Sequence, residues 1–139
     1  MLSEKARTFL SENRNGVLTT FRRNGAAQMS IVTCGLYGSG VAFTTTGDRA
    51  KLLNMKRDPR CSLLVSKSEW WGFIVLEGHA EIMSPEDTDA EKLRLALRDV
   101  YRVAAGEDHP DWDEYDRAMI EQVRSAVIVV PEHIYGTAL

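Results

Sequence analysis

Three strand-like runs separated by tight-turn signals fill the first third of the chain, and they constrain its fold more than any other feature. The runs are rich in β-branched and aromatic residues and cover residues 16–22, 27–35 and 41–46. Asn24-Gly25 separates the first two runs, and the Gly-Ser-Gly stretch 38–40 separates the second from the third. Because turns of this composition join neighbouring antiparallel strands, the pattern predicts a three-stranded meander.

Helices and strands alternate along the rest of the chain. Residues 3–13 place apolar side chains on one face behind Ser3, which predicts a short capped helix. Pro59 is expected to end a helix and Pro131 to bend or end a strand, because proline cannot donate a backbone hydrogen bond. The other expected helices cover residues 48–58, 85–104 and 111–123, and the other expected strands cover residues 60–67, 72–83 and 125–136.

The predicted fold class is mainly β, with inserted helices and about six antiparallel strands. Strands of this number and length commonly close into a barrel, since closure removes exposed sheet edges. The chain has 139 residues and no repeat or linker, so we expect one domain over residues 1–139. A domain of this size encloses little free space, so a bulky cofactor would occupy a groove shared with a second subunit.

Composition argues against several classes of protein and site. The net charge is −3 with both signs mixed along the chain, which disfavours nucleic-acid binding. No stretch approaches the roughly 20 apolar residues of a membrane span, so we expect no membrane partner and a cytoplasmic location. The cysteines and histidines show no ligand-like spacing, so we expect buried free thiols and no metal site. These residues are Cys34, Cys61, His79, His109 and His133.

The segment 44–51 contains the most informative candidate site. Three hydroxyls, at Thr44, Thr45 and Thr46, end a strand, and Arg49 and Lys51 then fall in the first turn of the expected helix. Cations are unfavourable at a helix N-terminus, which carries about half a positive charge. A bound phosphate would resolve the conflict, because the backbone N–H groups and both cations could converge on it. The alternative is that the intervening aspartate caps the helix and screens the cations.

Two further features could contribute to binding. Gln28 and Ser30 share one strand face, where they could meet the amide edges of a flat heteroaromatic ring or simply face solvent. Trp70 and Trp71 are adjacent, and on a strand they would face opposite ways, so one of them is a candidate for a subunit contact or for stacking on a cofactor. No Ser/His/Asp or Cys/His set has motif spacing, so we expect no catalytic side chain.

Four stretches together resemble the pyridoxamine-phosphate-oxidase-like split barrels, particularly the branch that uses the deazaflavin coenzyme F420. They are residues 16–32, 44–65, 70–82 and 105–136, and they span nearly the whole chain. The most specific parts are DRAKLLN with the following RDPR, and AGEDHPDWDEY.

The resemblance implies a split β-barrel homodimer with two cofactor sites, each built from both subunits. It implies a hydride transfer between the cofactor ring and a small-molecule substrate, with the protein supplying binding and orientation. By position, the cofactor-binding residues would be Arg49 and Lys51 at the phosphate, Thr44, Thr45 and Thr46 along the ring and ribityl chain, Gln28 and Ser30 at the ring edge, and Trp71 and Phe73 from the partner subunit.

Three functions are compatible with this resemblance. The leading one is an F420-dependent reductase acting on an unsaturated small molecule. FMN-using relatives share the scaffold and the phosphate-binding cations, so an FMN-dependent oxidase or reductase is the second. A non-catalytic protein that stores or shields a flavin, haem or tetrapyrrole is the third. Phe73 stands where relatives can carry a tyrosine, so one hydroxyl contact to the cofactor tail would be missing.

Overall fold

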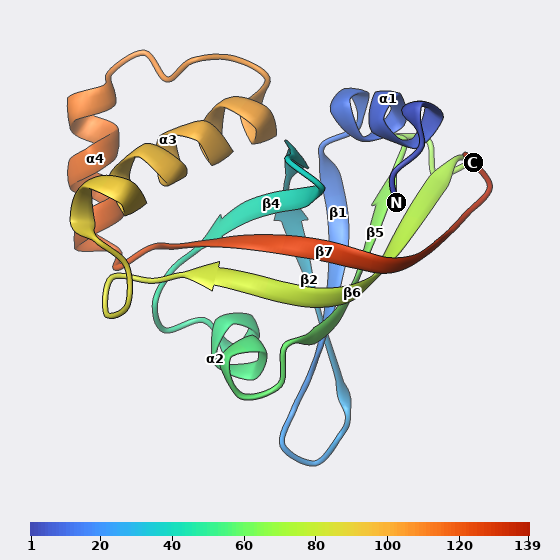
Figure 1. Ribbon diagram of the computed structural model, residues 1–139, viewed down its shortest axis with the longest axis horizontal. Coiled ribbons are helices and arrows are strands. Elements are labelled where there is room, and N and C mark those ends of the chain that lie inside the picture. Colours follow the sequence, from blue (N-terminus) through green and yellow to red (C-terminus); the bar gives the residue numbers. More distant parts are fainter.

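The computed structural model describes all residues from Met1 to Leu139 as one seven-stranded antiparallel sheet with four helices (Figure 1). The sheet curls into a half-barrel, which agrees with the expected split barrel. The helices are α1 (Glu4–Glu12), α2 (Ala50–Arg57), α3 (Ala90–Ala105) and α4 (Trp112–Glu121). The strands are β1 (Asn15–Phe21), β2 (Ala27–Thr33), β3 (Gly35–Tyr37), β4 (Gly40–Thr45), β5 (Arg60–Ser66), β6 (Phe73–Met83) and β7 (Ser125–Tyr135).

The strand order is β2-β1-β5-β6-β7-β4-β3, with the two longest strands in the middle. β6 and β7 pair over most of their length. β4 pairs with β7 as well, so that Thr45 at the end of β4 lies opposite Ser125 at the start of β7. The expected bend at Pro131 is confirmed as an irregularity: the register shifts at Glu77/Gly78, opposite Pro131, and β7 continues beyond it. Such a bulge increases strand twist and so helps the sheet to curl.

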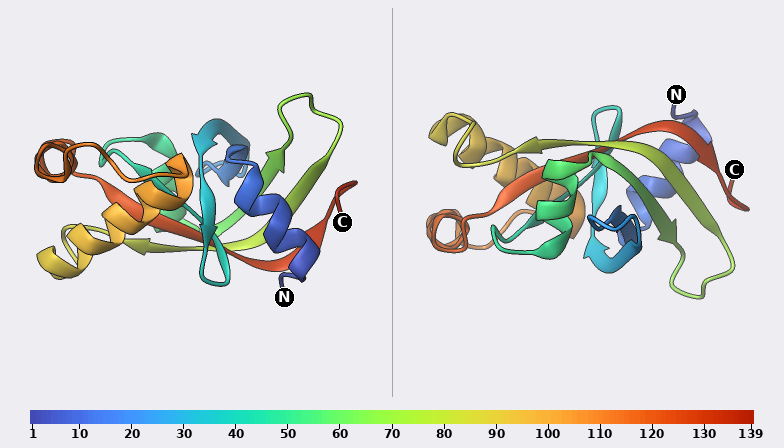
Figure 2. Two further views of the ribbon diagram at one scale, coloured as in Figure 1. Left: turned by 90° about the horizontal axis from the view of Figure 1, so that it is seen from above. Right: turned by 90° about the horizontal axis from the view of Figure 1, so that it is seen from below.

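The main core lies inside the curl. It contains alternate side chains of the strands, including Leu18, Phe43 and Leu63, together with Leu10 of α1 and Leu52 of α2. A second, smaller cluster lies under α3 and α4, where helix residues pack on the outside of β4 and β7. The helices therefore cover separate parts of the sheet, and α3 and α4 lie together at one end of the molecule (Figure 2).

The structure has one more strand than the sequence predicted, because the run 27–35 breaks at Cys34. β2 ends at Thr33 and pairs with β1, whereas β3 starts at Gly35 and pairs with β4 at the opposite edge of the sheet. Gly35 also lies against α3, since a Cβ there would come within 2.3 Å of the Val103 carbonyl oxygen. Periodicity cannot reveal this break, because both halves of the run are apolar and strand-like.

The third helix begins later than predicted. We expected it to start at Pro85, but α3 begins at Ala90 behind Asp89, whose side chain accepts the Lys92 N–H. Residues 84–88 form a turn instead, closed by the Asp87 carboxylate, which accepts the Ser84 N–H at 3.0 Å. The helices near residues 3–13 and 111–123 are confirmed, with Ser3 and Asp111 as their caps.

A buried polar contact fixes α2 to the sheet. The Asn54 side chain donates a hydrogen bond to the Thr20 hydroxyl of β1 at 3.1 Å, and both residues are buried. Because an unpaired buried hydroxyl is costly, this bond sets where α2 lies relative to β1. None of the four helices is long and apolar enough to cross a membrane.

Candidate functional site

An open groove of about 490 Å³ lies where the ends of β2 and β4, the start of α2, the helices α3 and α4 and the segment before β7 meet. It includes all five residues that the sequence singled out between positions 44 and 51. Its lining consists of Ile31, Val32, Thr33, Thr44, Thr45, Thr46, Arg49, Lys51, Val100, Tyr101, Ala104, Ala105, Tyr115, Met119 and Arg124.

The N-terminus of α2 has no side-chain cap. Arg49 occupies the capping position with extended backbone, and its side chain accepts no hydrogen bond. The alternative in which Asp48 caps the helix is therefore wrong. No acidic residue lies in the first turn either, so the first backbone N–H groups of α2 lack an anionic partner within the helix.

Three cationic side chains gather at this end of the groove without a carboxylate. Arg49, Lys51 and Arg124 all line it, and none of them has an acidic oxygen within 4.0 Å. The pKa of Lys51 is lowered by its burial and by the charges of Arg49 and Arg124. Burial, with Arg49 adding to it, also lowers the pKa of Arg124. A bound anion would relieve this repulsion.

Arg124 is the member of this cluster that the sequence did not reveal. Its Nη1 donates to the Thr44 hydroxyl at 3.2 Å, and its Nε donates to the Gln122 side chain at 2.8 Å. Thr44 and Arg124 are 80 positions apart, and they meet because β4 pairs with β7. No local pattern around Arg124 indicates this contact.

The hydroxyl of Thr45 is buried and makes no hydrogen bond. Buried polar groups are normally paired, and an orphan that lines a groove is a place where a ligand can supply the missing partner. The cations, the open helix N-terminus and this hydroxyl together fit a ligand that carries a phosphate and a polar chain.

Two of the sequence-predicted residues, Gln28 and Ser30, lie on β2 outside the groove lining. The Gln28 side chain accepts a hydrogen bond from Arg22 Nε at 3.1 Å, and the Ser30 hydroxyl is buried without a partner. The groove instead touches the later residues of the same strand, from Ile31 to Thr33. A role for Gln28 and Ser30 at a ring edge therefore stays a prediction.

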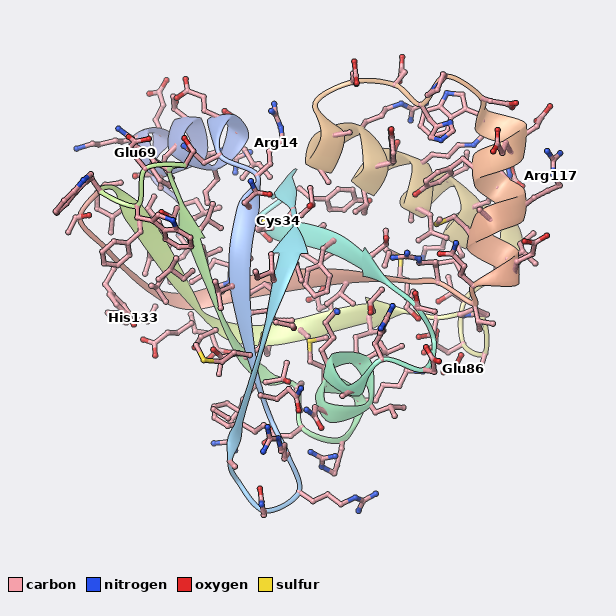
Figure 3. All side chains as sticks on the ribbon, turned by 180° about the vertical axis from the view of Figure 1, so that it is seen from behind. Arg14, Cys34, Glu69, Glu86, Arg117 and His133 are labelled. Atoms are coloured by element: carbon pink, nitrogen blue, oxygen red, sulfur yellow. The ribbon has the colours of Figure 1, made fainter.

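The other two, Trp71 and Phe73, lie far from the groove within one chain. Trp71 is in the loop between β5 and β6, at the end of the molecule away from α4 (Figure 2), and Phe73 begins β6. Figure 3 shows Glu69 of this loop and Arg117 of α4 at opposite ends of the molecule. The expectation that Trp70 and Trp71 face opposite sides of a strand is wrong, because both lie in the loop and are 69% and 86% exposed.

Aromatic residues of α3, α4 and the loop between them form a cluster beside the groove, and two of them, Tyr101 and Tyr115, line it. Tyr101, His109, Trp112 and Tyr115 have ring centroids 5.0–5.9 Å apart. The Tyr115 hydroxyl donates to the Leu97 carbonyl at 2.8 Å, and burial raises its pKa to about 12. Tyr115 is buried and packs in the core under α3 and α4, yet Tyr115 and Met119 also line the groove.

No group of three or more His, Cys, Asp or Glu side chains is placed to hold a metal ion. Cys34 and Cys61 are buried free thiols, as expected, and burial raises the pKa of each to about 12. A protonated, inaccessible thiol is a poor nucleophile, so neither cysteine is a candidate for covalent chemistry.

Solved structures with the same fold include proteins of different kinds. A conserved hypothetical protein from Mycobacterium tuberculosis matches with a TM-score of 0.78 and 21% identity, over 98% of this chain and 84% of that one. An F420 reductase matches with a TM-score of 0.64 and 22% identity, over 93% of this chain and 94% of that one. The heme storage protein HutZ from Vibrio cholerae matches with a TM-score of 0.68 and 13% identity, over 96% and 93%.

At these identities the structural matches establish the fold alone. The model of the pyridoxamine 5'-phosphate oxidase family matches residues 2–136, which is almost the whole chain. The chain belongs to the pyridoxamine 5'-phosphate oxidase family of split barrels.

Proposed function

We propose that this protein binds coenzyme F420 in the groove and acts as an F420-dependent reductase of an unsaturated small molecule. The observation that carries the proposal is the cluster of Arg49, Lys51 and Arg124, three cations without a carboxylate beside an uncapped helix N-terminus. Membership of a family named for an oxidase, and a fold shared with an F420 reductase, support a redox cofactor.

Each group in the groove has a distinct part in binding. The Arg49 guanidinium can hold two phosphate oxygens at once, while the Lys51 ammonium acts as a point charge. Thr45 offers its free hydroxyl to the polar chain of the cofactor. Apolar side chains such as Val100 and Met119 would cover a flat ring and exclude water from it.

Bound F420 would supply the hydride, so the chain needs to bind and orient rather than to react. Of the two tyrosines that line the groove, Tyr115 has its proton committed to the Leu97 carbonyl, and its pKa is raised to about 12. It is therefore a poor proton donor at neutral pH. We assign the proton of the reaction to solvent or to the cofactor's surroundings.

A second basic cleft on the other side of α2 favours F420 over FMN. Arg22, Arg23 and Arg57 line it together with Ala50, which lies between Arg49 and Lys51 in the sequence. None of the three arginines has a carboxylate within 4.0 Å. F420 carries carboxylates beyond its phosphate, whereas FMN ends at its phosphate, so only F420 could use this cleft.

The side chain of Arg23 tests this preference, since it is exposed and makes no hydrogen bond within the chain. Arg23→Ala should weaken F420 binding by about 0.5–1 kcal/mol, the scale of an exposed charge pair, and leave FMN binding unchanged. If Arg23→Ala weakened F420 binding and FMN binding equally, the cleft would have no part in the preference for F420 over FMN.

We further propose a homodimer in which the loop between β5 and β6 reaches the groove of the partner. Exposed apolar side chains occur on this loop, at Trp70 and Trp71, and on β2, where Met29 is 65% and Ile31 is 80% exposed. Exposed apolar area of this kind is typical of interfaces. Ile31 also lines the groove, so a partner seated on β2 would lie beside the cofactor.

Mixing two defective variants tests the shared site. Arg49→Ala impairs the groove, and Trp71→Ser impairs the contribution of the loop. A mixed dimer then has one intact site, made from the groove of one subunit and the loop of the other, so cofactor binding should reappear after mixing and exchange. If Trp71 acted within its own subunit, no mixture would recover binding.

Titration of the purified protein with F420 and, separately, with FMN tests the function. F420 fluorescence should saturate at a lower concentration than FMN fluorescence, and reduced F420 should then be oxidised by members of a panel of unsaturated acceptors. A tightly bound FMN would support the second enzymatic function. Cofactor binding without turnover of any acceptor would support the storage function. The groove lining contains neither histidine nor cysteine, so a haem iron would depend on Tyr101, Tyr115 or Met119 for a protein ligand, and we rank haem storage behind flavin binding for this reason.

A further inference from the structure

A second cleft, of about 410 Å³, lies between the first half of α3, the second half of α4 and the turn that precedes α3. It shares two lining residues, Met119 and Arg124, with the groove, so the two spaces are neighbours. Its volume is in the range of small-molecule sites in proteins. The lining consists of Pro85, Thr88, Ala90, Glu91, Leu93, Arg94, Leu97, Asp116, Met119, Ile120, Val123 and Arg124.

Charged side chains in this cleft neutralise one another. Arg94 forms ion pairs with Glu91 and, at 3.4 Å, with Asp116. Asp116 also accepts two hydrogen bonds from Arg98, at 3.0 and 2.5 Å. Arg124 is directed to the Thr44 hydroxyl on the groove side. Glu91, Arg94 and Asp116 therefore offer no free charge to a ligand, and a charged ligand would have to break one of these pairs. Arg124 has no carboxylate partner, and its unpaired charge lies on the side that the cleft shares with the groove.

Apolar side chains stand open at the rim of the cleft. Ile120 is 77% and Val123 is 50% exposed, although both are large enough to favour burial. Val123 also has a φ of +52°, which is rare for a β-branched residue. The preceding carbonyl, of Gln122, accepts the Gly47 N–H at 3.2 Å and helps to hold this backbone in place. The rim is thus a fixed apolar surface rather than a loose end.

We propose that the cleft between α3 and α4 is a second binding site, for an uncharged and mainly apolar small molecule. The volume supplies the space, the exposed rim supplies the apolar contact, and the mutual pairing of Glu91, Arg94 and Asp116 disfavours an ionic ligand. The site differs from the phosphate end of the groove, since neither Arg49 nor Lys51 lines it, although it shares Met119 and Arg124 with the groove.

Binding of the neutral dye N-phenyl-1-naphthylamine to the protein without cofactor tests this site. The dye fluoresces more strongly in apolar surroundings, so a titration gives its dissociation constant. Two variants change exposed lining residues: Ala90→Trp fills the cleft and Ile120→Ser removes part of its rim. The matched control is Leu95→Ser, which removes an apolar side chain that is 49% exposed on α3 but does not line the cleft.

The wild-type protein and the Leu95→Ser variant should bind the dye equally. Ala90→Trp and Ile120→Ser should each weaken binding about fivefold to tenfold, the loss expected for one apolar side-chain contact. Saturable binding that is equal in all four proteins would overturn the proposal, and so would a lack of saturable binding to the wild type. Because all titrations use protein without cofactor, a failure of the F420 proposal leaves these outcomes unaffected.

Discussion

Arginine side chains at two places in the molecule have opposite surroundings. On α3, Arg94, Arg98 and Arg102 each pair with a carboxylate, and Arg98 and Arg102 also lie over the ring of Trp112 at 5.1 and 4.6 Å. At the start of α2, Arg49 and the nearby Arg124 have no carboxylate within reach. Arginine therefore contributes to packing and ion pairing on α3, whereas at the start of α2 its charge is not neutralised by a carboxylate.

This difference separates structural from functional charge. A paired arginine contributes to the fold, so its removal should change stability and leave ligand binding alone. An unpaired arginine in a cluster of like charges costs the fold some repulsion, and such a cost is typical of binding sites. Family membership says that the chain is a split barrel, whereas the pairing of its charges says where an anion would bind.

The largest expected effect follows removal of the unpaired cations. Arg49→Ala, Lys51→Ala and Arg124→Ala should each weaken cofactor binding by about 1.5–3 kcal/mol, the scale of a hydrogen bond to an ionised group. Isothermal titration calorimetry should show this loss of affinity. The thermal unfolding temperature of the ligand-free protein should stay the same or rise slightly. The matched control is Arg117→Ala, since Arg117 is exposed on α4 and directed away from the molecule (Figure 3). If Arg117→Ala lost as much cofactor affinity as the other three variants, the unpaired cations would not differ from an ordinary surface arginine.

The paired side of the comparison is tested by Asp116→Ala. Asp116 is 16% exposed and accepts from both Arg94 and Arg98, so the variant leaves two arginines without this partner. The free energy of unfolding should fall by about 1–2 kcal/mol, a value reduced from that of a fully buried charge because the arginines remain partly solvated. Chemical denaturation measures it. Cofactor affinity should stay at the wild-type value, and a loss of affinity without a loss of stability would contradict the assignment.

The pH dependence of binding sharpens the comparison further. Lys51 must be protonated to attract an anion, and its burial, with Arg49 and Arg124 beside it, lowers its pKa. Affinity should therefore fall as the pH rises from neutral through this lowered pKa, and the fall should begin below the pH at which an ordinary lysine loses its proton. Lys51→Arg, which stays charged over this range, should bind with little dependence on pH. If the affinity of the wild type were as independent of pH as that of Lys51→Arg, Lys51 would not be a contact of the bound anion.

The smallest effect is expected for Arg102→Ala. Arg102 is 42% exposed, and its partners Asp99 and Asp108 are more exposed still. Exposed pairs of this kind contribute roughly 0.2–1 kcal/mol to stability, to which the contact with Trp112 adds about as much. Thermal unfolding should therefore shift by only a few degrees. A loss larger than that of Asp116→Ala would reverse the expected order on α3.

Local sequence was sufficient for the features whose causes are local. The hydroxyls, the glycine and the cations of residues 44–51 are consecutive, so the groove end at α2 could be predicted. The cap at Ser3 and the bend at Pro131 likewise depend on single residues, and both are confirmed.

Features that depend on distant contacts could not be predicted in the same way. Arg124 joins the groove through the pairing of β4 with β7, and Gly35 starts a new strand that pairs with β4 and lies against α3. The second cleft likewise depends on how α3 and α4 pack together, so no sequence pattern indicated it. Asp48 shows that a local pattern can also mislead. Aspartate is a favourable capping residue, but α2 begins one residue later, with Arg49 at the capping position.

A crystal structure of the protein with F420, or with FMN if F420 does not bind, tests the central claim most directly. The cofactor's phosphate should lie at the start of α2, within hydrogen-bond distance of Arg49, Lys51 and Arg124. A phosphate bound elsewhere in the molecule, with these three side chains in contact only with water, would contradict it.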